Sequence, residues 1–449
     1  MNLHRLLRAR AEEGRPVGVG LIGCGKFASM FLAQVPRTPG LAVPAIADRD
    51  PARAAAMLAK IGWEADRIAP NGAEARPGCT ALAEDPAAVA SHPEVEVVVE
   101  ATGDPKAGAL HALAAIEAGK HVVMVNVEAD ALVGPVLADQ ARRAGVVYSL
   151  AYGDQPALIC ELVDTVRTGG LAVVAAGKGT KYLPAFHAST PQTVWQHYGI
   201  DPVAAARGGM NPRMFNSFLD GTKSAIEMAA VANATGLAPP EDGLLFLPCG
   251  VDDLPRVLRP RAEGGVLERA GMVEVVSSLE RDGRAVHRDL RWGVYVVFEG
   301  ETDYVRACFA EYGVTTDPAG RYAALYRPFH LIGLELGVSI ASVALRREAT
   351  GFAEAWRADV AAVAKRDLAA GEVLDGEGGF MVWGKCVPAH RAVQERTLPI
   401  GLAHGVPLAR AVQAGEMLRY GDAVLDETDA VLRLRRALEG GATLGSSAR

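Results

Sequence analysis

The stretch that decides the fold is VGVGLIGCGKFA, residues 17–28, near the start of the chain. Its apolar first half predicts a buried strand, and the pattern that follows it predicts a helix. Gly23, Gly25 and Ala28 have the spacing GxGxxA. The first glycine permits a tight turn, the second lets the backbone approach a pyrophosphate, and the small third residue lets helix and strand pack closely. The stretch therefore predicts a dinucleotide-binding turn, with Lys26 and Phe27 as further cofactor contacts.

A second apolar run, residues 41–47, leads directly to an acidic residue, Asp48. Asp48 follows Gly23 by 25 positions, where a carboxylate that binds the adenosine ribose hydroxyls is expected, and this favours NAD. Arg49 beside it can pair with a 2′-phosphate, which favours NADP. We expect either nicotinamide cofactor, with NADPH favoured.

Further strands are expected at 95–100 and 121–125, with a helix around 107–119 between them. Strands and helices that alternate in this way imply right-handed crossovers and a parallel sheet. We therefore predict a doubly wound Rossmann domain over residues 1–153. Polar or small residues that follow its strand ends are candidate cofactor contacts, since a parallel sheet binds its ligand there. These are Thr102, Gly103, Asn126 and Glu128.

The pattern changes after residue 153 and predicts an α+β substrate domain over residues 154–350. The expected elements are helices at 155–168 and 215–235 and strands at 171–177, 272–279 and 292–299. A last apolar helix, 329–347, is expected to pack back on the first domain.

Charged residues interrupt the apolar pattern of the expected helix 215–235. Asp220, Lys223 and Glu227 are spaced i, i+3, i+7, which places them on one helical face. A lysine held between two carboxylates can donate a proton to a carbonyl oxygen. The alternative is a solvated face of ion pairs.

Two further lysines, Lys178 and Lys181, lie in the glycine-containing segment GKGTK, residues 177–181, which is expected to form a flexible loop at a strand end. Such a loop suits an anionic group such as a phosphate, and the alternative is a pair of solvent lysines. His330, at the start of the expected helix 329–347, is a candidate for catalysis or for packing.

The last segment, residues 351–449, contains an internal repeat. RDLAAGEVL at 366–374 recurs as RAVQAGEML at 410–418, and each copy is a glycine turn between short strand-like runs. We predict a small all-β unit made of two related halves.

Composition excludes several classes of protein. The 46 basic and 53 acidic residues give a net charge of −7, and no basic block is present, which argues against a dedicated nucleic-acid binder. The six cysteines form no CxxC pair, so a disulfide scaffold or a structural zinc site is not expected. The longest apolar stretch is too short for a membrane span. We expect a cytoplasmic homodimer or larger homo-oligomer that acts on a small molecule.

The motifs together resemble a known family. They are GCGKFA at 23–28, EATG at 100–103, GKGTKYLP at 177–184, FLDGTKSAIEMA at 218–229, RPFHLIGLELG at 327–337 and the repeat. With them the chain resembles the homoserine-dehydrogenase-like NAD(P)-dependent oxidoreductases that carry a C-terminal SAF (β-clip) domain. One branch of that group, the 1-deoxy-D-xylulose 5-phosphate reductoisomerase-like enzymes, isomerises and reduces a sugar phosphate with NADPH in isoprenoid biosynthesis.

The resemblance implies roles for the candidate residues. The family's lysine role implies that Lys223 polarises the substrate carbonyl, and we expect Asp220 and Glu227 to orient Lys223 or to hold a divalent Mg or Mn ion. Homoserine dehydrogenases have a lysine where this chain has Val127-Glu128, which argues against aspartate semialdehyde, whereas Lys178 and Lys181 favour a phosphorylated substrate. Two alternatives stay open, reduction of an amino-acid semialdehyde and a non-catalytic dinucleotide-binding sensor or assembly subunit.

Overall fold

Strand β1 (Val17–Ile22), the first half of the stretch quoted above, lies at the centre of a seven-stranded sheet, and all six of its residues are buried. The strand order is β3-β4-β2-β1-β5-β6-β7, and neighbouring strands pair in parallel. The other strands are β2 (Leu41–Ala47), β3 (Ile68–Ala69), β4 (Thr80–Ala83), β5 (Val97–Glu100), β6 (His121–Met124) and β7 (Tyr148–Leu150). This confirms the predicted doubly wound parallel sheet.

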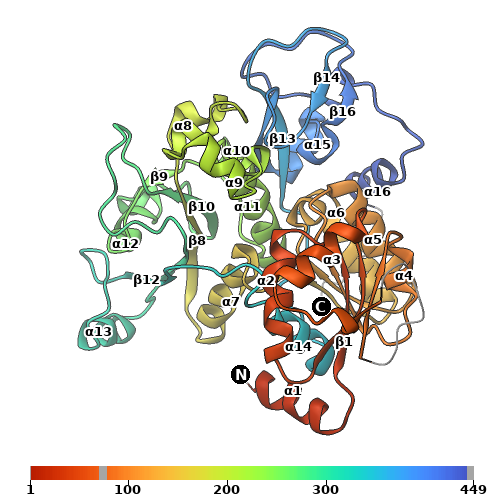
Figure 1. Cartoon of the computed structure of the whole chain (residues 1–449). Coiled ribbons are helices and arrows are strands. Elements are labelled where there is room, and N and C mark those ends of the chain that lie inside the picture. The colour runs from red at the N-terminus through yellow and green to blue at the C-terminus, as the bar shows by residue number, and fades with distance from the viewer. Residues whose placement is uncertain (1, 70–77, 442–449) are drawn as a thin grey trace. The chain divides into compact units, whose positions relative to one another are not determined.

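The computed structural model describes residues 2–69 and 78–441 (Figure 1). The chain divides into two compact units. Unit 1 contains Met1–Leu158, Leu331–Ala353 and Leu434–Arg449, and unit 2 contains Ile159–His330 and Glu354–Arg433. The chain therefore returns to unit 1 twice, which differs from the expected succession of segments 1–153, 154–350 and 351–449.

Helices alternate with the strands of unit 1 along the chain. They are α1 (Leu3–Glu12), α2 (Lys26–Gln34), α3 (Pro51–Lys60), α4 (Ala87–Ala90), α5 (Pro105–Glu117) and α6 (Val127–Arg143). Helices α7 (Gln155–Thr168) and α16 (Ala430–Glu439) cross the points where the chain passes between the units.

The helix expected at 329–347 is shorter in the structure, where α14 spans Gly337–Arg346. The chain before it turns at Gly333, whose φ is +70° and where an added Cβ would lie 2.4 Å from the carbonyl oxygen of Phe27. Leu336 and Ile340, both fully buried, join the core of unit 1. That packing explains why the chain returns to this unit.

Unit 2 is built on a mixed five-stranded sheet in the order β12-β11-β8-β10-β9. The strands are β8 (Ala172–Thr180), β9 (Leu247–Pro248), β10 (Met272–Ser277), β11 (Val294–Glu299) and β12 (Tyr322–Arg327). The central strand β8 pairs in parallel with β10 and antiparallel with β11. The mixed α+β character agrees with the prediction.

The helices of this part of unit 2 are α8 (Val194–Tyr198), α9 (Pro202–Arg207), α10 (Pro212–Leu219), α11 (Thr222–Thr235), α12 (Leu254–Val257) and α13 (Asp303–Glu311). The prediction of one long helix at 215–235 was wrong. The chain breaks between α10 and α11 at Gly221, whose φ of +90° is left-handed and incompatible with a continuous helix.

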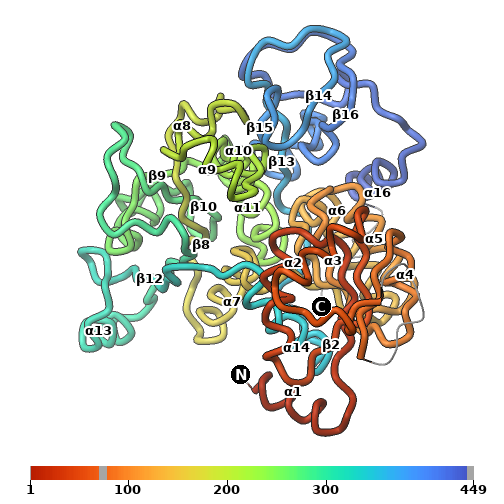
Figure 2. Tube along the Cα trace, viewed as in Figure 1, coloured from red at the N-terminus to blue at the C-terminus, as the bar shows by residue number. Residues whose placement is uncertain are grey.

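The C-terminal part of unit 2 contains two short strand pairs, β13 (Ala358–Ala364) with β15 (Val382–Pro388) and β14 (Val373–Asp375) with β16 (His404–Pro407) (Figure 2). The two copies of the repeat lie against each other, since Leu368 and Val412 exchange backbone hydrogen bonds of 2.8 and 2.9 Å. Helix α15 (Ala389–Glu395) follows β15, so this segment is not all-β as predicted.

Among the described residues, no helix combines the length and the apolar character that crossing a lipid bilayer requires.

Candidate functional site

The glycine turn of unit 1 has the geometry that a pyrophosphate site needs. Gly23 has a φ of +92°, and a Cβ there would lie 2.8 Å from the backbone of Ala101. Gly25 caps the N-terminus of α2, and a Cβ there would meet nothing within 4 Å. The missing side chain leaves the first turn of α2, which contains Lys26 and Phe27, open to a ligand. The turn therefore fits the phosphates of a dinucleotide.

Asp48 lies directly after β2 and is held by three donors. Its carboxylate accepts hydrogen bonds from the amides of Cys24 (2.7 Å) and Asp50 (3.0 Å) and from the guanidinium of Arg53 (2.9 Å). Burial alone would raise its pKa, but these hydrogen bonds outweigh burial and hold the pKa below its usual value. Asp48 is therefore ionised at neutral pH.

The arginine that contacts Asp48, the predicted ribose-binding carboxylate, is not the one that the sequence suggested. Arg53, in the first turn of α3, contacts Asp48, whereas Arg49 is exposed. The proline at position 51 is the signal that could have pointed to Arg53. A helix that begins at Pro51 directs its third residue, Arg53, back toward the end of the strand.

The ends of β5 and β6 are linked by hydrogen bonds. Asn126 caps α6 by accepting from the amide of Ala129 at 3.1 Å, and its amide donates to the carbonyl of Asp104 at 2.8 Å. The hydroxyl of Thr102 donates to Glu100 at 2.5 Å. Asn126 and Thr102 thus shape the loops after these strands.

Two other residues predicted at these strand ends differ in exposure. Gly103, with a φ of +76°, has open space where a side chain would be, which suits the close approach of a ligand. Glu128 is half-buried in the first turn of α6. His111, whose Nδ1 lies 3.1 Å from Glu100, is a polar neighbour that the sequence analysis missed, because it lies inside the apolar pattern of α5.

In unit 2, a buried ion pair joins the central strand to α11. The Nζ of Lys178 on β8 donates to Oε2 of Glu227, and the side chains are only 8% and 5% exposed. Lys223 precedes Glu227 by one helical turn on the same side of α11. A buried lysine–carboxylate pair is costly to desolvate, so it is a candidate for proton transfer rather than a simple source of stability.

The prediction that Lys178 lies on a flexible loop was wrong, because β8 continues to Thr180. Lys178 pairs with Val275 of β10 and Val294 of β11. Gly177 and Gly179, on either side of Lys178, let the neighbouring backbone pack closely against β8 and do not form a turn. A Cβ on Gly177 would lie 1.7 Å from the carbonyl oxygen of Glu274, and one on Gly179 would lie 1.9 Å from that of Leu290.

Asp220 does not share a helical face with Lys223 and Glu227, because it caps the C-terminus of α10, before the break at Gly221. It is fully buried, and its Oδ2 accepts from Nζ of Lys365 at 2.7 Å. Burial raises its pKa, and the nearby ammonium opposes that effect. The structure thus gives Asp220 a partner in the C-terminal segment, apart from the Lys178–Glu227 pair.

Lys181 lies one residue after β8 beside a second cation. Its Nζ donates to the carbonyl of His197 at 2.6 Å and lies 5.4 Å from the ring centroid of Tyr198, which Arg291 also approaches at 5.7 Å. Burial and the charge of Arg291 lower the pKa of Lys181. Two cations therefore lie beside the same aromatic ring at the end of β8.

His330 lies outside any helix and contacts the carbonyl of Trp292 through Nδ1 at 2.7 Å, so this nitrogen carries the proton. No cluster of three or more His, Cys, Asp or Glu side chains within residues 2–69 and 78–441 is arranged to hold a metal ion.

Comparison with protein families gives two adjacent matches. Residues 23–150 match the family described as homoserine dehydrogenase, NAD binding domain, and residues 153–336 match oxidoreductase DRL, catalytic domain. The chain therefore carries a homoserine-dehydrogenase-type NAD-binding domain followed by a DRL-type oxidoreductase catalytic domain, which confirms the predicted resemblance. Neither match reaches residues 351–449, so the SAF domain stays a prediction.

Comparison with solved structures finds distant likenesses. A homoserine dehydrogenase from Thiobacillus denitrificans is 16% identical, with a TM-score of 0.42, over 74% of this chain and 74% of that one. A putative oxidoreductase from Klebsiella pneumoniae is 16% identical, with a TM-score of 0.37, over 76% and 88%. A DOX-P reductoisomerase with fosmidomycin and magnesium is 15% identical, with a TM-score of 0.34, over 47% and 56%.

The chain spans about half the length of the first solved structures that it matches, 52% and 56%. No curated protein matches its sequence.

Proposed function

We propose that this chain, which joins a homoserine-dehydrogenase-type NAD-binding domain to a DRL-type catalytic domain, reduces the carbonyl group of a small anionic substrate with a nicotinamide cofactor. The substrate class that we favour is a sugar phosphate or a related keto-polyol. The observation that carries the proposal is the buried Lys178–Glu227 pair, which lies inside the region matched by an oxidoreductase catalytic domain.

The chemistry of reduction assigns a role to this pair. Bound NADH or NADPH supplies a hydride to the carbonyl carbon. The carbonyl oxygen then gains negative charge, and the Nζ of Lys178 is a donor suited to stabilise it and to give it a proton. Glu227 accepts a hydrogen bond from Lys178 and so holds its Nζ in place, and Lys223, one turn away on α11, is a second donor in the same region.

The anionic part of the substrate has separate partners. Lys181 and Arg291, both beside the ring of Tyr198, supply two positive charges at the end of β8. Two such cations suit the double charge of a phosphate, since charge-assisted hydrogen bonds to phosphate are stronger than neutral ones. This supports a phosphorylated substrate over an uncharged one.

The cofactor half of the proposal rests on Asp48. A carboxylate that is ionised and held by three donors can accept hydrogen bonds from ribose hydroxyls and repels a 2′-phosphate. We therefore favour NADH over the NADPH that Arg49 suggested. The positive charge of Arg53 is partly offset by its ion pair with Asp48, so Arg53 does not by itself create a 2′-phosphate site.

The test is oxidation of NADH and NADPH in the presence of 1-deoxy-D-xylulose 5-phosphate, erythrulose phosphates and aspartate semialdehyde, with and without magnesium or manganese. We expect turnover with a phosphorylated substrate. The double variant Lys178→Met/Glu227→Gln removes the donor without leaving a buried charge unpaired, and it should abolish turnover and leave NADH binding unchanged. Lys60→Met, at an exposed lysine on α3, should change neither.

Each other outcome has a defined meaning. A rearranged carbon skeleton in the product of 1-deoxy-D-xylulose 5-phosphate would assign the chain to the reductoisomerase-like branch. Turnover of aspartate semialdehyde alone would favour the homoserine-dehydrogenase type of reaction. Tight NADH binding without oxidation across the panel would contradict the proposal and favour a sensor. Full activity of Lys178→Met/Glu227→Gln would contradict the role given to Lys178.

A further inference from the structure

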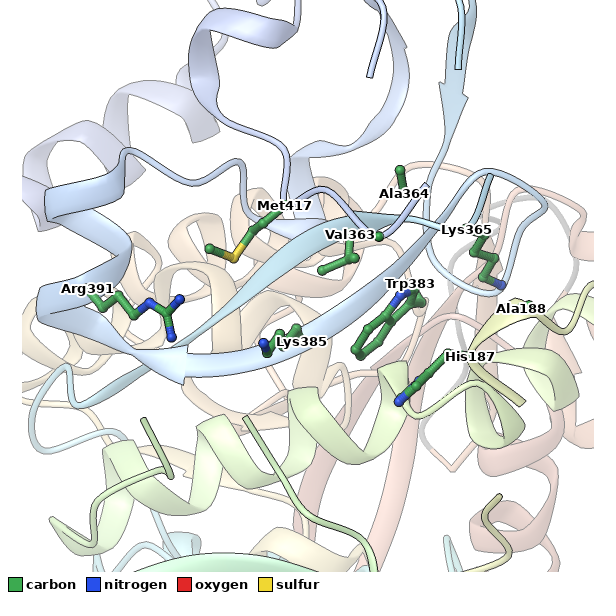
Figure 3. Close-up of a pocket in the computed structure, with 10 residues that line it drawn as sticks. His187, Ala188, Val363, Ala364, Lys365, Trp383, Lys385, Arg391 and Met417 are labelled. Atoms are coloured by element: carbon green, nitrogen blue, oxygen red, sulfur yellow. The ribbon is translucent and has the colours of Figure 1, made fainter. Parts of the chain in front are cut away.

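A cavity of about 470 Å³ lies in unit 2, against the C-terminal strands (Figure 3). Small-molecule sites commonly have volumes of about 300–1,000 Å³. Most of its lining comes from residues beyond position 350, outside both family matches, and it shares no residue with the Lys178–Glu227 pair. Its lining residues are His187, Ala188, Val363, Ala364, Lys365, Trp383, Lys385, Arg391, Gly415 and Met417.

Three cations line the cavity, and two of them are already neutralised. Lys365 donates to Asp220 at 2.7 Å and to two backbone carbonyls. Arg391 donates to Glu395 at 2.7 Å and to Asp242 at 3.1 Å. Within residues 2–69 and 78–441, the structure shows no hydrogen bond or ion pair from Lys385. The cavity therefore contains one positive charge that a ligand can pair with.

The position of Lys385 is set by its surroundings. The aliphatic part of the Lys385 side chain packs against Gly243, where an added Cβ would lie 2.8 Å from Cε of Lys385. The φ of +90° at Gly243 also favours glycine. Burial and the nearby charge of Arg391 lower the pKa of Lys385, although Asp242 and Glu395 act in the opposite direction. In Figure 3 the ends of Lys385 and Arg391 point toward one another. An anion bound at Lys385 would supply a counter-charge that offsets both the burial of the ammonium and the repulsion from Arg391.

The remaining walls are aromatic and apolar. The ring of His187 stacks on Trp383 with centroids 3.8 Å apart. Its Nδ1 contacts the carbonyl of Asp220 and its Nε2 contacts the hydroxyl of Tyr182, so both ring nitrogens are used inside the protein. Burial lowers its pKa to about 4, which keeps the ring neutral near pH 7. The imidazole thus contributes an uncharged surface.

From these observations we infer that the cavity binds a small organic monoanion, a carboxylate with a planar apolar body. The carboxylate pairs with Lys385, and the apolar body lies against Trp383, Val363 and Met417. An inorganic anion would leave the apolar walls uncovered, and a neutral aromatic compound would leave the charge of Lys385 unpaired.

The site is linked to the start of α11. Gly384, between Trp383 and Lys385, donates its amide to the hydroxyl of Thr222 at 2.8 Å, and Thr222 is the first residue of α11. A ligand in this cavity would therefore contact both sequence neighbours of Gly384, the residue that is hydrogen-bonded to the start of the helix carrying Lys223 and Glu227.

The experiment is isothermal titration of the full chain with benzoate and indole-3-carboxylate, with benzamide and sulfate as probes that lack the charge or the apolar body. We expect the two carboxylates to bind and the other two to bind at least tenfold more weakly. Lys385→Met should weaken carboxylate binding at least tenfold, Lys385→Arg should retain it, and Lys60→Met should leave it unchanged.

Equal binding of benzoate and benzamide, or unchanged binding by Lys385→Met, would overturn the inference. So would absence of carboxylate binding by the unmodified chain. Should Lys385→Met fail to fold, Trp383→Leu serves as the second variant, and retention of full carboxylate affinity by that variant would equally contradict the proposed site.

Discussion

The Nζ of Lys365 lies 2.7 Å from Oδ2 of Asp220, although 145 positions separate the two residues in the sequence. Their side chains are 2% and 0% exposed. Lys365 also donates to the carbonyls of Ser189 and Gly379, both at 2.8 Å, so each of its three protons has an acceptor. This ion pair joins the C-terminal segment to the α10–α11 junction within unit 2.

Asp220→Asn should strongly destabilise the protein, because it leaves the ammonium of Lys365 buried without a counter-charge. We expect a loss of about 3–5 kcal/mol in the free energy of unfolding, measured by urea denaturation. The double variant Asp220→Asn/Lys365→Met should recover part of that loss. Glu12→Gln, which removes an exposed ion pair with Arg8, is the control and should cost less than about 1 kcal/mol. Equal losses in Asp220→Asn and Glu12→Gln would contradict a structural role for the buried pair.

Gly221→Ala tests the break between α10 and α11. Its φ is +90°, and a Cβ there would lie 3.2 Å from both His187 and Phe246, so the substitution adds strain and crowding. We expect a loss of about 1–3 kcal/mol in the free energy of unfolding. Gly236→Ala, at the other end of α11, also has a positive φ of +72° but open space around the added Cβ, and should cost only about 1 kcal/mol. A continuous helix through 215–235 would instead make Gly221→Ala stabilising.

The raised pKa of the buried Glu274 predicts that the stability of the protein depends on pH. Burial raises its pKa to about 8, against the opposing effect of amide hydrogen bonds from Val275, Leu245 and Phe246. Because the folded state holds the proton more tightly than the unfolded state, the stabilisation is complete below the usual carboxyl pKa and is lost as the pH rises through about 8. The difference in unfolding free energy between the unmodified chain and Glu274→Gln should therefore fall between pH 5 and pH 8.5, by about 1.4 kcal/mol per unit of pH at most.

Thermal or urea unfolding across that pH range measures this difference. Glu301→Gln, an exposed glutamate before α13, is the matched control and should show a constant difference. A constant difference for Glu274→Gln would show that its amide hydrogen bonds keep the carboxylate ionised in the folded protein.

Asp48→Asn tests the cofactor preference. Removing the negative charge removes the repulsion of a 2′-phosphate and weakens the hydrogen bonds to the ribose hydroxyls. We expect the ratio of the NADPH and NADH dissociation constants to shift at least tenfold toward NADPH, as measured by fluorescence of the reduced nicotinamide. Arg49→Ala should leave that ratio nearly unchanged, since Arg49 is exposed. A large loss of NADPH affinity in Arg49→Ala would restore the original case for NADP.

The nucleotide-binding part of the fold could be predicted from the sequence, because its signals are local. An apolar run, a glycine turn and a helix lie within residues 17–34, and β1, β2, β5 and β6 all form where their apolar runs predict them. The contact between Arg53 and Asp48 was not predicted, because side-chain direction at a helix start depends on the turn and not on proximity in sequence.

The catalytic part was predicted less well, since its contacts are long-range. Lys178 and Glu227 are 49 positions apart in the sequence. The residues around Gly177 and Gly179 do not show whether these glycines permit close strand packing or form a turn. Asp220 forms its ion pair with Lys365, which is distant in sequence. Its helical spacing to Lys223 and Glu227 therefore did not predict this contact. The helix at 329–347 was overextended because the apolar run continues through Gly333, where the chain turns with a φ of +70°.

Gly177 and Gly179 flank the proposed proton donor, and neither leaves room for a side chain. A saturation-mutagenesis screen scored by activity alone would therefore report positions 177–179 as one intolerant block. At the outer positions the lack of room for a side chain explains the intolerance, whereas at position 178 loss of the proton donor adds to loss of the buried ion pair. Activity measured per folded molecule would separate the middle position from its two neighbours.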